Sequence, residues 1–275
     1  MSHASSSLTK MAFSTKLPTA SLRTLSLTTL VVAGLLVHSD SVAPVSRRMM
    51  QLPRLTLWVW ERPEDLRSLD PAITAIAYLD RTVQIGHDGG VRVELRSQAA
   101  VFPWKTSATA VVRLEVEPGT IISPEIQERA LAALIASAKQ AGISTFQVDF
   151  DATRSQREFY RKLLIDLRQA MPPDLPLSIT ALASWCSWDD WIHGLPVDEA
   201  VPMFFRMEPD RLRGQAPRAE YRVRERLCQG SVGVSTREPW PEQEVSGKRI
   251  YFFPDRGWRQ DASLLAAELH LRRSP

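Results

Sequence analysis

The feature that most constrains the fold is a regular alternation of short strand-like runs with helix-like segments. Eight such runs occur, and each is rich in the β-branched or aromatic residues that strands prefer. They cover residues 55–60, 75–79, 110–116, 145–150, 177–182, 200–205, 231–235 and 250–254. Eight strands with intervening helices over about 220 residues predict one (β/α)8 barrel at the small end of that fold's size range.

The segments between the strands carry helix signals. Ser123 and Pro124 are a typical N-cap and first position, and the apolar periodicity after them stops at Gly142. A second helical segment, residues 153–171, ends before Pro172. An open, doubly wound sheet is the competing layout, but it would need a glycine-rich phosphate loop after an early strand, and the sequence has none.

The second unit departs from the strand–helix alternation. Asp88-Gly89-Gly90 lies between two alternating runs within residues 81–102. This pattern is typical of a β-hairpin. We therefore predict a hairpin insertion that either replaces a helix or covers one end of the barrel.

The N-terminus is predicted to be a targeting segment. Three basic residues precede the uncharged, largely apolar run Thr24–Val37, which is followed by small and polar residues. This order fits a signal peptide, while an uncleaved membrane anchor stays open because Pro44 follows Ala43 directly. We expect residues 1–45 to serve export, and the barrel to span residues 54–273 after an irregular linker. The expected location is periplasmic or secreted, and an anchor in the inner membrane is the open alternative.

Charge argues against a nucleic-acid partner. The formal net charge is +3, yet five of the 34 basic residues and only one of the 31 acidic residues lie within residues 1–50. The remainder is balanced to within one charge, whereas nucleic-acid binding needs a basic surface. Membrane contact is expected only through the N-terminal segment.

The two cysteines, Cys186 and Cys228, match no zinc-binding spacing. They would pair in an oxidising compartment and stay as buried thiols in the cytosol. The five histidines are scattered and form no metal-ligand motif. We expect no metal site and no cofactor.

The fourth strand-like run, TFQVDFD (residues 145–151), raises the main functional question. Side chains on a strand alternate, so Gln147, Asp149 and Asp151 share one face while apolar residues occupy the other. Two like charges facing an enclosed space cost free energy, which favours a functional role. Asp149 and Asp151 are therefore the candidate catalytic residues. Asp151 is equally suited to cap the helix that follows.

Chemistry in such barrels collects at the carboxyl ends of the strands, where several acids and aromatic residues are expected. The candidate substrate-binding residues there are Trp60, Glu61, Glu115, Trp185, Arg206 and Asp255. Carboxylates accept hydrogen bonds from hydroxyls and aromatic faces cover sugar rings, so a glycan is the favoured partner.

Two of these residues carry specific expectations. Trp185 is expected to face the site, whereas Trp188 and Trp191 are expected to pack against the barrel wall. Arg206 either holds a site carboxylate ionised or forms a structural ion pair.

These residues also carry a resemblance. FQVDFD resembles the D-x-D-x-E signature on the fourth strand of chitinase-like glycosidases. Together with LWVWERPEDL, LSITALASWC and EAVPMFFRM, it looks like a family of uncharacterised bacterial proteins placed among the glycosidase-type TIM barrels. The resemblance implies that Asp149 orients and stabilises, and that Asp151 donates a proton. Gln147 stands where the signature has its first acid, and Asp151 is one methylene shorter than the glutamate.

Three functions follow as hypotheses. The leading one is an exported glycoside-hydrolase-like enzyme with a paired-carboxylate site. The alternative is a catalytically inert barrel that binds a saccharide or a cell-envelope partner. A third is a divalent-metal site made by Asp149, Asp151 and Glu115, which requires the three carboxylates to converge.

Overall fold

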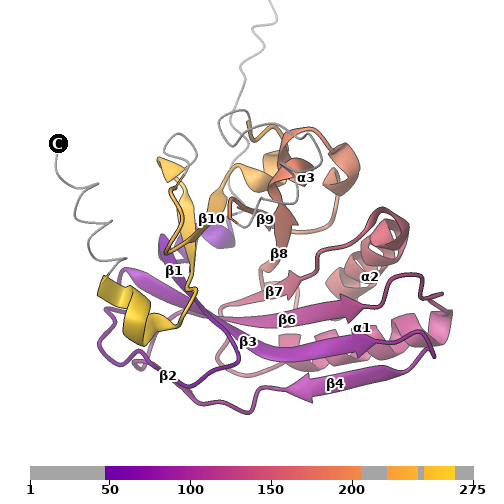
Figure 1. The fold of residues 1–275 in the computed structure, drawn as a ribbon, viewed down its shortest axis with the longest axis horizontal. Helices are drawn as coiled ribbons and strands as arrows, with labels where there is room; N and C mark the ends of the chain where they lie inside the picture. Colours follow the sequence, from indigo (N-terminus) through magenta and orange to yellow (C-terminus); the bar gives the residue numbers. More distant parts are fainter. Residues whose placement is uncertain (1–46, 206–221, 241–244, 264–275) are drawn as a thin grey trace, which may run out of the picture. The chain divides into compact units, whose positions relative to one another are not determined.

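The protein is seen here in a computed structural model that describes residues 47–205, 222–240 and 245–263 (Figure 1). The described residues belong to one compact unit, residues 41–275. Its main sheet has the strand order β1-β11-β10-β9-β8-β7-β6-β3-β4, and β1 also pairs with β3. All pairings around the ring from β1 to β3 are parallel. The eight strands therefore close into a barrel, as predicted, and the open sheet is wrong.

All eight predicted runs lie on barrel strands. These are β1 Leu55–Val59, β3 Thr74–Ile85, β6 Ala108–Val116, β7 Thr145–Asp149, β8 Leu177–Leu182, β9 Glu199–Met203, β10 Ser231–Ser235 and β11 Arg249–Phe253. Outside the ring lie β4 Val91–Leu95 and a two-stranded parallel sheet of β2 Glu64–Asp65 and β5 Ala100–Val101. The described helices are α1 Pro124–Ala138, α2 Arg157–Ala170 and α3 Ala183–Ser187, with 3-10 turns η1 Met49–Gln51, η2 Arg154–Gln156, η3 Asp190–Ile192 and η5 Arg226–Cys228.

The predicted hairpin insertion is confirmed. Strand β3 continues past the barrel and pairs with β4 in antiparallel fashion, from Arg81↔Leu95 to Ile85↔Val91. The turn between them uses Gly89 at φ 73°, a conformation that costs glycine little. A register irregularity between Leu79 and Arg81 marks the point where β3 leaves the expected short strand.

The helix signals are also confirmed. The Ser123 hydroxyl accepts a hydrogen bond from the Ile126 amide at 3.4 Å, with Pro124 at the first helical position. Helix α1 ends at Ala138, one turn before the predicted stop at Gly142, which takes φ 82° in the loop that follows. On α2, the apolar face at Phe159, Leu163, Leu164 and Leu167 is buried. This face packs on the outside of the barrel with the apolar side of β7.

The barrel begins earlier in the chain than expected. The residues before 54 were predicted to be an irregular linker, but Met49 in η1 is fully buried. Arg249 on β11 donates hydrogen bonds to the carbonyls of Met49 and Pro53. A buried guanidinium needs acceptors, and this segment supplies them. Residues 1–45 lie outside the described part, and no described helix is long and apolar enough to cross a membrane.

Cys186 in α3 and Cys228 in η5 form a disulfide, with their Cα atoms 5.9 Å apart. Both residues are buried. The bond ties the segment before β10 to the end of β8.

Candidate functional site

A cleft of about 580 Å³ opens at the carboxyl ends of the barrel strands. Strands β1, β3, β6, β7, β8, β9 and β11 or the residues directly after them contribute to its walls. Six predicted site residues line it, namely Trp60, Glu61, Glu115, Asp149, Asp151 and Asp255. The alternation of strand side chains brings these residues together although they are up to 195 positions apart in the chain.

Asp149 sits at the floor of this cleft with an exposed fraction of only 3%. Its register partner on β6 is Arg113, and the Arg113 Nη1 atom donates to Asp149 Oδ2 at 2.6 Å. The Thr180 hydroxyl on β8 donates to Oδ1 at 2.7 Å. Both carboxylate oxygens thus have a short hydrogen bond, and the nearby guanidinium compensates for the burial of the charge.

Arg113 links this pair to a third acid. Its Nε atom donates to Glu115 Oε1 at 3.0 Å, while Nη1 holds Asp149. Burial disfavours the guanidinium charge, but Asp149 and Glu115 outweigh this effect and raise the pKa of Arg113. The cation stays charged, and it neutralises part of the negative charge in the cleft.

Asp151 is the acid whose proton affinity is raised. It lies at the rim with its side chain open to solvent, yet the surrounding cleft removes part of its water shell and raises its pKa. The charge of Asp149 raises the pKa further, and Arg113 opposes the shift. Within the described residues, no hydrogen bond to the Asp151 carboxylate is found.

The capping role open to Asp151 is taken by another residue. Thr153 and Gln156 form a reciprocal capping box at η2, with the Thr153 amide donating to Gln156 Oε1 at 2.9 Å. The helix start is therefore satisfied without Asp151. Helix capping therefore does not explain why residue 151 is an aspartate.

Glu61 is fixed at the opposite rim. One oxygen accepts hydrogen bonds from the Ser97 amide and hydroxyl and from the Gln98 amide, at 2.8–3.0 Å. Partial burial disfavours the ionised form, but these hydrogen bonds outweigh it and lower the pKa of Glu61. Glu61 is thus an ionised acceptor and not a proton donor at neutral pH.

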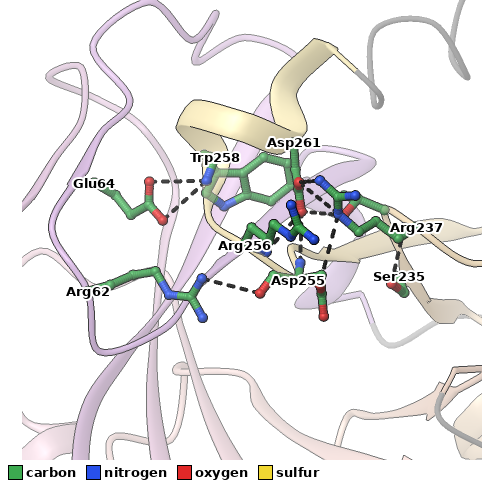
Figure 2. Close-up of polar contacts among 9 residues, drawn as sticks. Arg62, Glu64, Ser235, Arg237, Asp255, Arg256, Trp258 and Asp261 are labelled. Carbon is green, nitrogen blue, oxygen red and sulfur yellow. Dashed lines mark hydrogen bonds and ion pairs between the residues drawn. The ribbon is translucent and has the colours of Figure 1, made fainter.

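Asp255 is positioned by a polar cluster behind the rim, which Figure 2 shows. Asp261 is fully buried and accepts hydrogen bonds from the Asp255 and Arg256 amides and from Arg237. Arg62 donates to the Asp255 carbonyl at 3.3 Å. The loop after β11 is therefore held in place. Asp255 lines the cleft, and its Oδ2 atom lies 3.9 Å from Arg237 Nε.

Two expectations about tryptophans are wrong. Trp185 has an exposed fraction of 2% and packs edge-on against Trp191 in the outer core. It does not line the cleft, because the chain turns into α3 directly after β8. Trp188, expected to pack, has an exposed fraction of 44%. Arg206 lies outside the described residues.

The structure adds cleft residues that the sequence did not suggest. Arg113 and Thr180 hold Asp149, and their positions on β6 and β8 share the inward parity of Glu115 and Leu182. Phe205 and Phe253 extend the aromatic wall beside Trp60, with the Phe205 and Phe253 ring centroids 4.7 Å apart. The parity of Arg113 with Glu115 was the signal that could have found it.

The convergence required by the metal hypothesis is not found. In the described ranges, no group of three acidic, histidine or cysteine side chains is arranged to hold a metal ion. Instead, Arg113 bonds both Asp149 and Glu115. A guanidinium between two carboxylates takes the place that a cation would occupy.

Residues 106–201 match the family model described as Domain of unknown function (DUF3142). No curated protein matches the chain.

Among solved structures, the chitinase domain of the spore coat protein CotE from Clostridium difficile is 13% identical, with a TM-score of 0.37. It aligns with 59% of this chain, which spans about half (51%) of that structure's length. Chitinase RmChi1 from Rhizomucor miehei is also 13% identical, with a TM-score of 0.44, over 66% of this chain and 69% of that one.

The family match covers the part of the chain that builds the acid site. It runs through β6, α1, β7, α2, β8 and α3 into β9, and it contains Arg113, Asp149, Asp151 and Thr180. The resemblance to an uncharacterised family is confirmed over these residues. This chain is a (β/α)8 barrel whose residues 106–201 match the domain of unknown function DUF3142.

Proposed function

We propose that this barrel is a glycoside-hydrolase-like enzyme that acts on a glycan, with Asp151 as the general acid and Asp149 as its ionised partner. One observation carries the proposal. Asp151, with a raised pKa and no capping role, lies beside a buried carboxylate that Arg113 and Thr180 hold in place. A carboxyl group that keeps its proton toward neutral pH is what departure of a sugar hydroxyl requires.

The proposed step uses the cleft residues in distinct roles. The Asp151 carboxyl gives its proton to the glycosidic oxygen as the bond to the sugar carbon breaks. A solvent water adds its oxygen to that carbon and releases a proton to solvent, so the products are two hydroxyl-terminated sugars. The carboxylate left behind is stabilised by the charge of Arg113, which opposes part of the rise in the pKa of Asp151. Asp149 has both oxygens engaged, so it acts by charge and by orienting Arg113, not as a nucleophile.

The walls of the cleft support a sugar ligand. Trp60, Phe205 and Phe253 line it as apolar aromatic faces, and Glu61 and Asp255 provide fixed hydrogen-bond acceptors. Apolar rings next to a few convergent polar groups are typical of small-molecule sites. A pyranose ring has the complementary surface, with apolar faces and a rim of hydroxyl donors.

The test is incubation of the purified barrel with a panel of bacterial and plant glycans, with products detected by mass spectrometry. We expect the wild-type protein to release a product from at least one glycan. Asp151→Asn should lose that activity, by about a hundredfold or more, since general acid catalysis contributes about 10² to 10⁴. Full activity in Asp151→Asn would exclude Asp151 as the acid.

A second candidate is a catalytically inert barrel that binds a saccharide or a cell-envelope partner. The observation that favours it is the saturation of Asp149, which leaves Asp151 as a lone, short carboxyl side chain at the rim. Binding of a glycan without any product, equally in wild type and Asp151→Asn, would support this candidate.

We also propose that the protein is exported to the periplasm or beyond, with the N-terminal segment as signal peptide or inner-membrane anchor. The Cys186–Cys228 disulfide supports this, because such bonds persist in oxidising compartments. Cell fractionation with an antibody to the barrel tests the location. Recovery of the full-length protein in the cytosol with both thiols reduced would refute it.

A further inference from the structure

A second cavity, of about 980 Å³, lies next to the barrel mouth, and its wall is the hairpin insertion. Figure 1 shows β4 beside the long β3, with α1 nearby. This hairpin cavity shares Arg113, Glu115 and Asp151 with the cleft at the barrel mouth. The two spaces therefore meet at Asp151, and a ligand that reaches Asp151 from the mouth can extend along the hairpin.

Hydrogen bonds hold the hairpin wall in one conformation. The Gly86 amide donates to the Gly90 carbonyl at 3.0 Å, and the Gly90 amide donates to Asp88 at 2.8 Å. The His87 amide donates to Glu117 Oε2 at 2.8 Å. A wall fixed in this way loses little conformational entropy when a ligand binds.

The acids of the hairpin cavity mostly have partners within the protein. Asp88 accepts from Gly90, Glu117 accepts from His87, and Glu115 accepts from Arg113 and from Gln84 at 3.3 Å. These carboxylates are engaged by donors of the wall itself. Within the described residues, none of them forms an ion pair with the remaining two arginines of the cavity, Arg92 and Arg129.

Two arginines of the same cavity, in contrast, form hydrogen bonds with neutral acceptors and not with carboxylates. Arg92 Nη1 donates to Gln84 Oε1 at 3.4 Å, and Arg129 Nη2 donates to the Val91 carbonyl at 3.0 Å. Both acceptors are neutral, and within the described part of the chain neither guanidinium has an ion-pair partner. Val91 precedes Arg92 directly, so the Arg129 guanidinium is bonded next to the backbone of Arg92. Each arginine has further donors for an anion, because a guanidinium carries five N–H groups.

From this arrangement we propose that the hairpin cavity binds an anionic group, a carboxylate or a sulfate, on an extended glycan whose other part occupies the barrel mouth. The proposal rests on the proposed glycan-binding role of the mouth and names the substrate class more closely. Arg92 and Arg129 are the binding residues, and both oxyanions match a guanidinium fork.

The test compares charged hexasaccharides with neutral forms of equal length, using the full chain and isothermal titration calorimetry. Hexagalacturonate and a hyaluronan hexasaccharide carry carboxylates, and each is paired with its methyl ester. A carrageenan hexasaccharide carries sulfates and is paired with its desulfated form. We expect at least one charged member to bind about tenfold more tightly than its neutral form. The member that does so identifies the anion as carboxylate or sulfate.

The variants assign this preference to the two arginines. Arg92→Gln and Arg129→Gln should each weaken binding of the charged member by about fivefold and leave its neutral form unchanged. Arg129→Lys, which keeps the charge, should retain most of the affinity. The matched control is Lys139→Gln, which removes an exposed cation at the other end of α1 and should have no effect.

Equal affinity for charged and neutral forms in every pair, absence of binding throughout, or a loss as large in Lys139→Gln would overturn the proposal. Mass spectrometry of the same mixtures reports turnover separately. Charge-dependent binding without product would contradict the proposed enzyme activity and leave the anion site standing. Product formation from neutral glycans alone would support the proposed enzyme activity and contradict the anion site.

Discussion

Two carboxylates inside this barrel are buried to nearly the same extent, but they lie at opposite ends of it and their surroundings differ. Glu199 near the closed end has an exposed fraction of 2%, and Asp149 near the mouth has one of 3%. Each is paired with an arginine, through Arg249 at 2.7 Å and Arg113 at 2.6 Å respectively. Burial and ion pairing therefore do not distinguish a structural acid from a functional one here.

At the closed end, both oxygens of the Glu199 carboxylate have hydrogen-bond donors. Glu199 accepts hydrogen bonds from Arg249, from the Tyr251 hydroxyl at 2.8 Å and from Ser178 at 3.3 Å. Burial and the charge of Glu199 hold the pKa of Tyr251 well above its usual range, so this hydroxyl stays a donor. The arginine on this side has an exposed side-chain fraction of only 7%.

The mouth has the same kind of ion pair with an opening above it. Arg113 has an exposed side-chain fraction of 32%, and the cleft continues to Asp151. What separates the two ends is therefore a second acid that faces a cavity without a hydrogen-bond partner among the described residues. This comparison makes the Asp149–Asp151 pair, and not Glu199, the candidate for chemistry.

The largest effect is expected when the ion pair of the closed end is broken. Arg249→Met leaves Glu199 charged and buried, and we expect a loss of about 3–5 kcal/mol in the free energy of unfolding, measured with urea. Arg249 also satisfies the carbonyls of Met49 and Pro53, which adds to the loss.

The double variant Arg249→Met/Glu199→Gln is the control for this experiment. It removes the uncompensated charge and should recover part of the loss, since replacing both partners of a buried pair costs less than replacing one. A loss below about 1 kcal/mol in the single variant would mean that water reaches Glu199, and the comparison of the two ends would fail.

A smaller effect is expected at the mouth. Arg113→Gln removes the cation beside Asp149, but the exposed side of the pair lets water compensate in part. We expect a loss of about 2 kcal/mol, clearly below that of Arg249→Met. The same urea measurement applies. An equal loss at both ends would show that the mouth is as closed as the other end.

The sequence predicted the mouth better than the closed end, for a physical reason. Asp149 belongs to a strand whose alternation of apolar and polar residues is complete, so its inward direction could be inferred. Glu199 stands at the first position of β9, one residue before the predicted start of the strand at Ala200. Strand boundaries are decided by pairing with neighbours, which a single sequence does not contain.

Arg113 was missed for a related reason. The strand was predicted correctly, and Glu115 at its end was chosen as a site residue while Arg113 was not. Only the register Arg113↔Asp149 between β6 and β7 places the guanidinium against the carboxylate. Trp185 failed because α3 begins immediately after β8, so the helix and not the strand sets its direction. Pairing register is a tertiary property, and α3 begins without a side-chain N-cap that the sequence could have shown.

A third variant compares single hydrogen bonds at the two ends. Thr180→Val removes the donor to Asp149 Oδ1 and keeps the side-chain shape, and we expect a loss of about 1.5 kcal/mol in the free energy of unfolding. The matched change, Ser178→Ala, removes a longer bond to Glu199, which keeps two other donors. It should cost less, and a larger loss than in Thr180→Val would contradict the assigned hydrogen bonds.

The smallest effect concerns Asp151 and has the opposite sign. Because the folded state raises the pKa of Asp151, it binds this proton more tightly than the unfolded chain does. Stability linked to this group is therefore present below its usual pKa and is lost as the pH rises through the raised value. Asp151→Asn does not titrate, so it avoids this loss.

We expect Asp151→Asn to match wild type at about pH 3 and to gain at most about 2 °C in Tm at pH values above the raised pKa, where wild-type Asp151 is ionised beside Asp149. The gain is small because solvent reaches the rim, and differential scanning calorimetry across this pH range measures it. Asp151→Ala should show the same pH dependence, because it also removes the charge. Stability lost in both variants at neutral pH would mean that the carboxylate makes a favourable contact in the fold. Asp151 would then be structural like Glu199, and the difference between the two ends of the barrel would rest on the cleft alone.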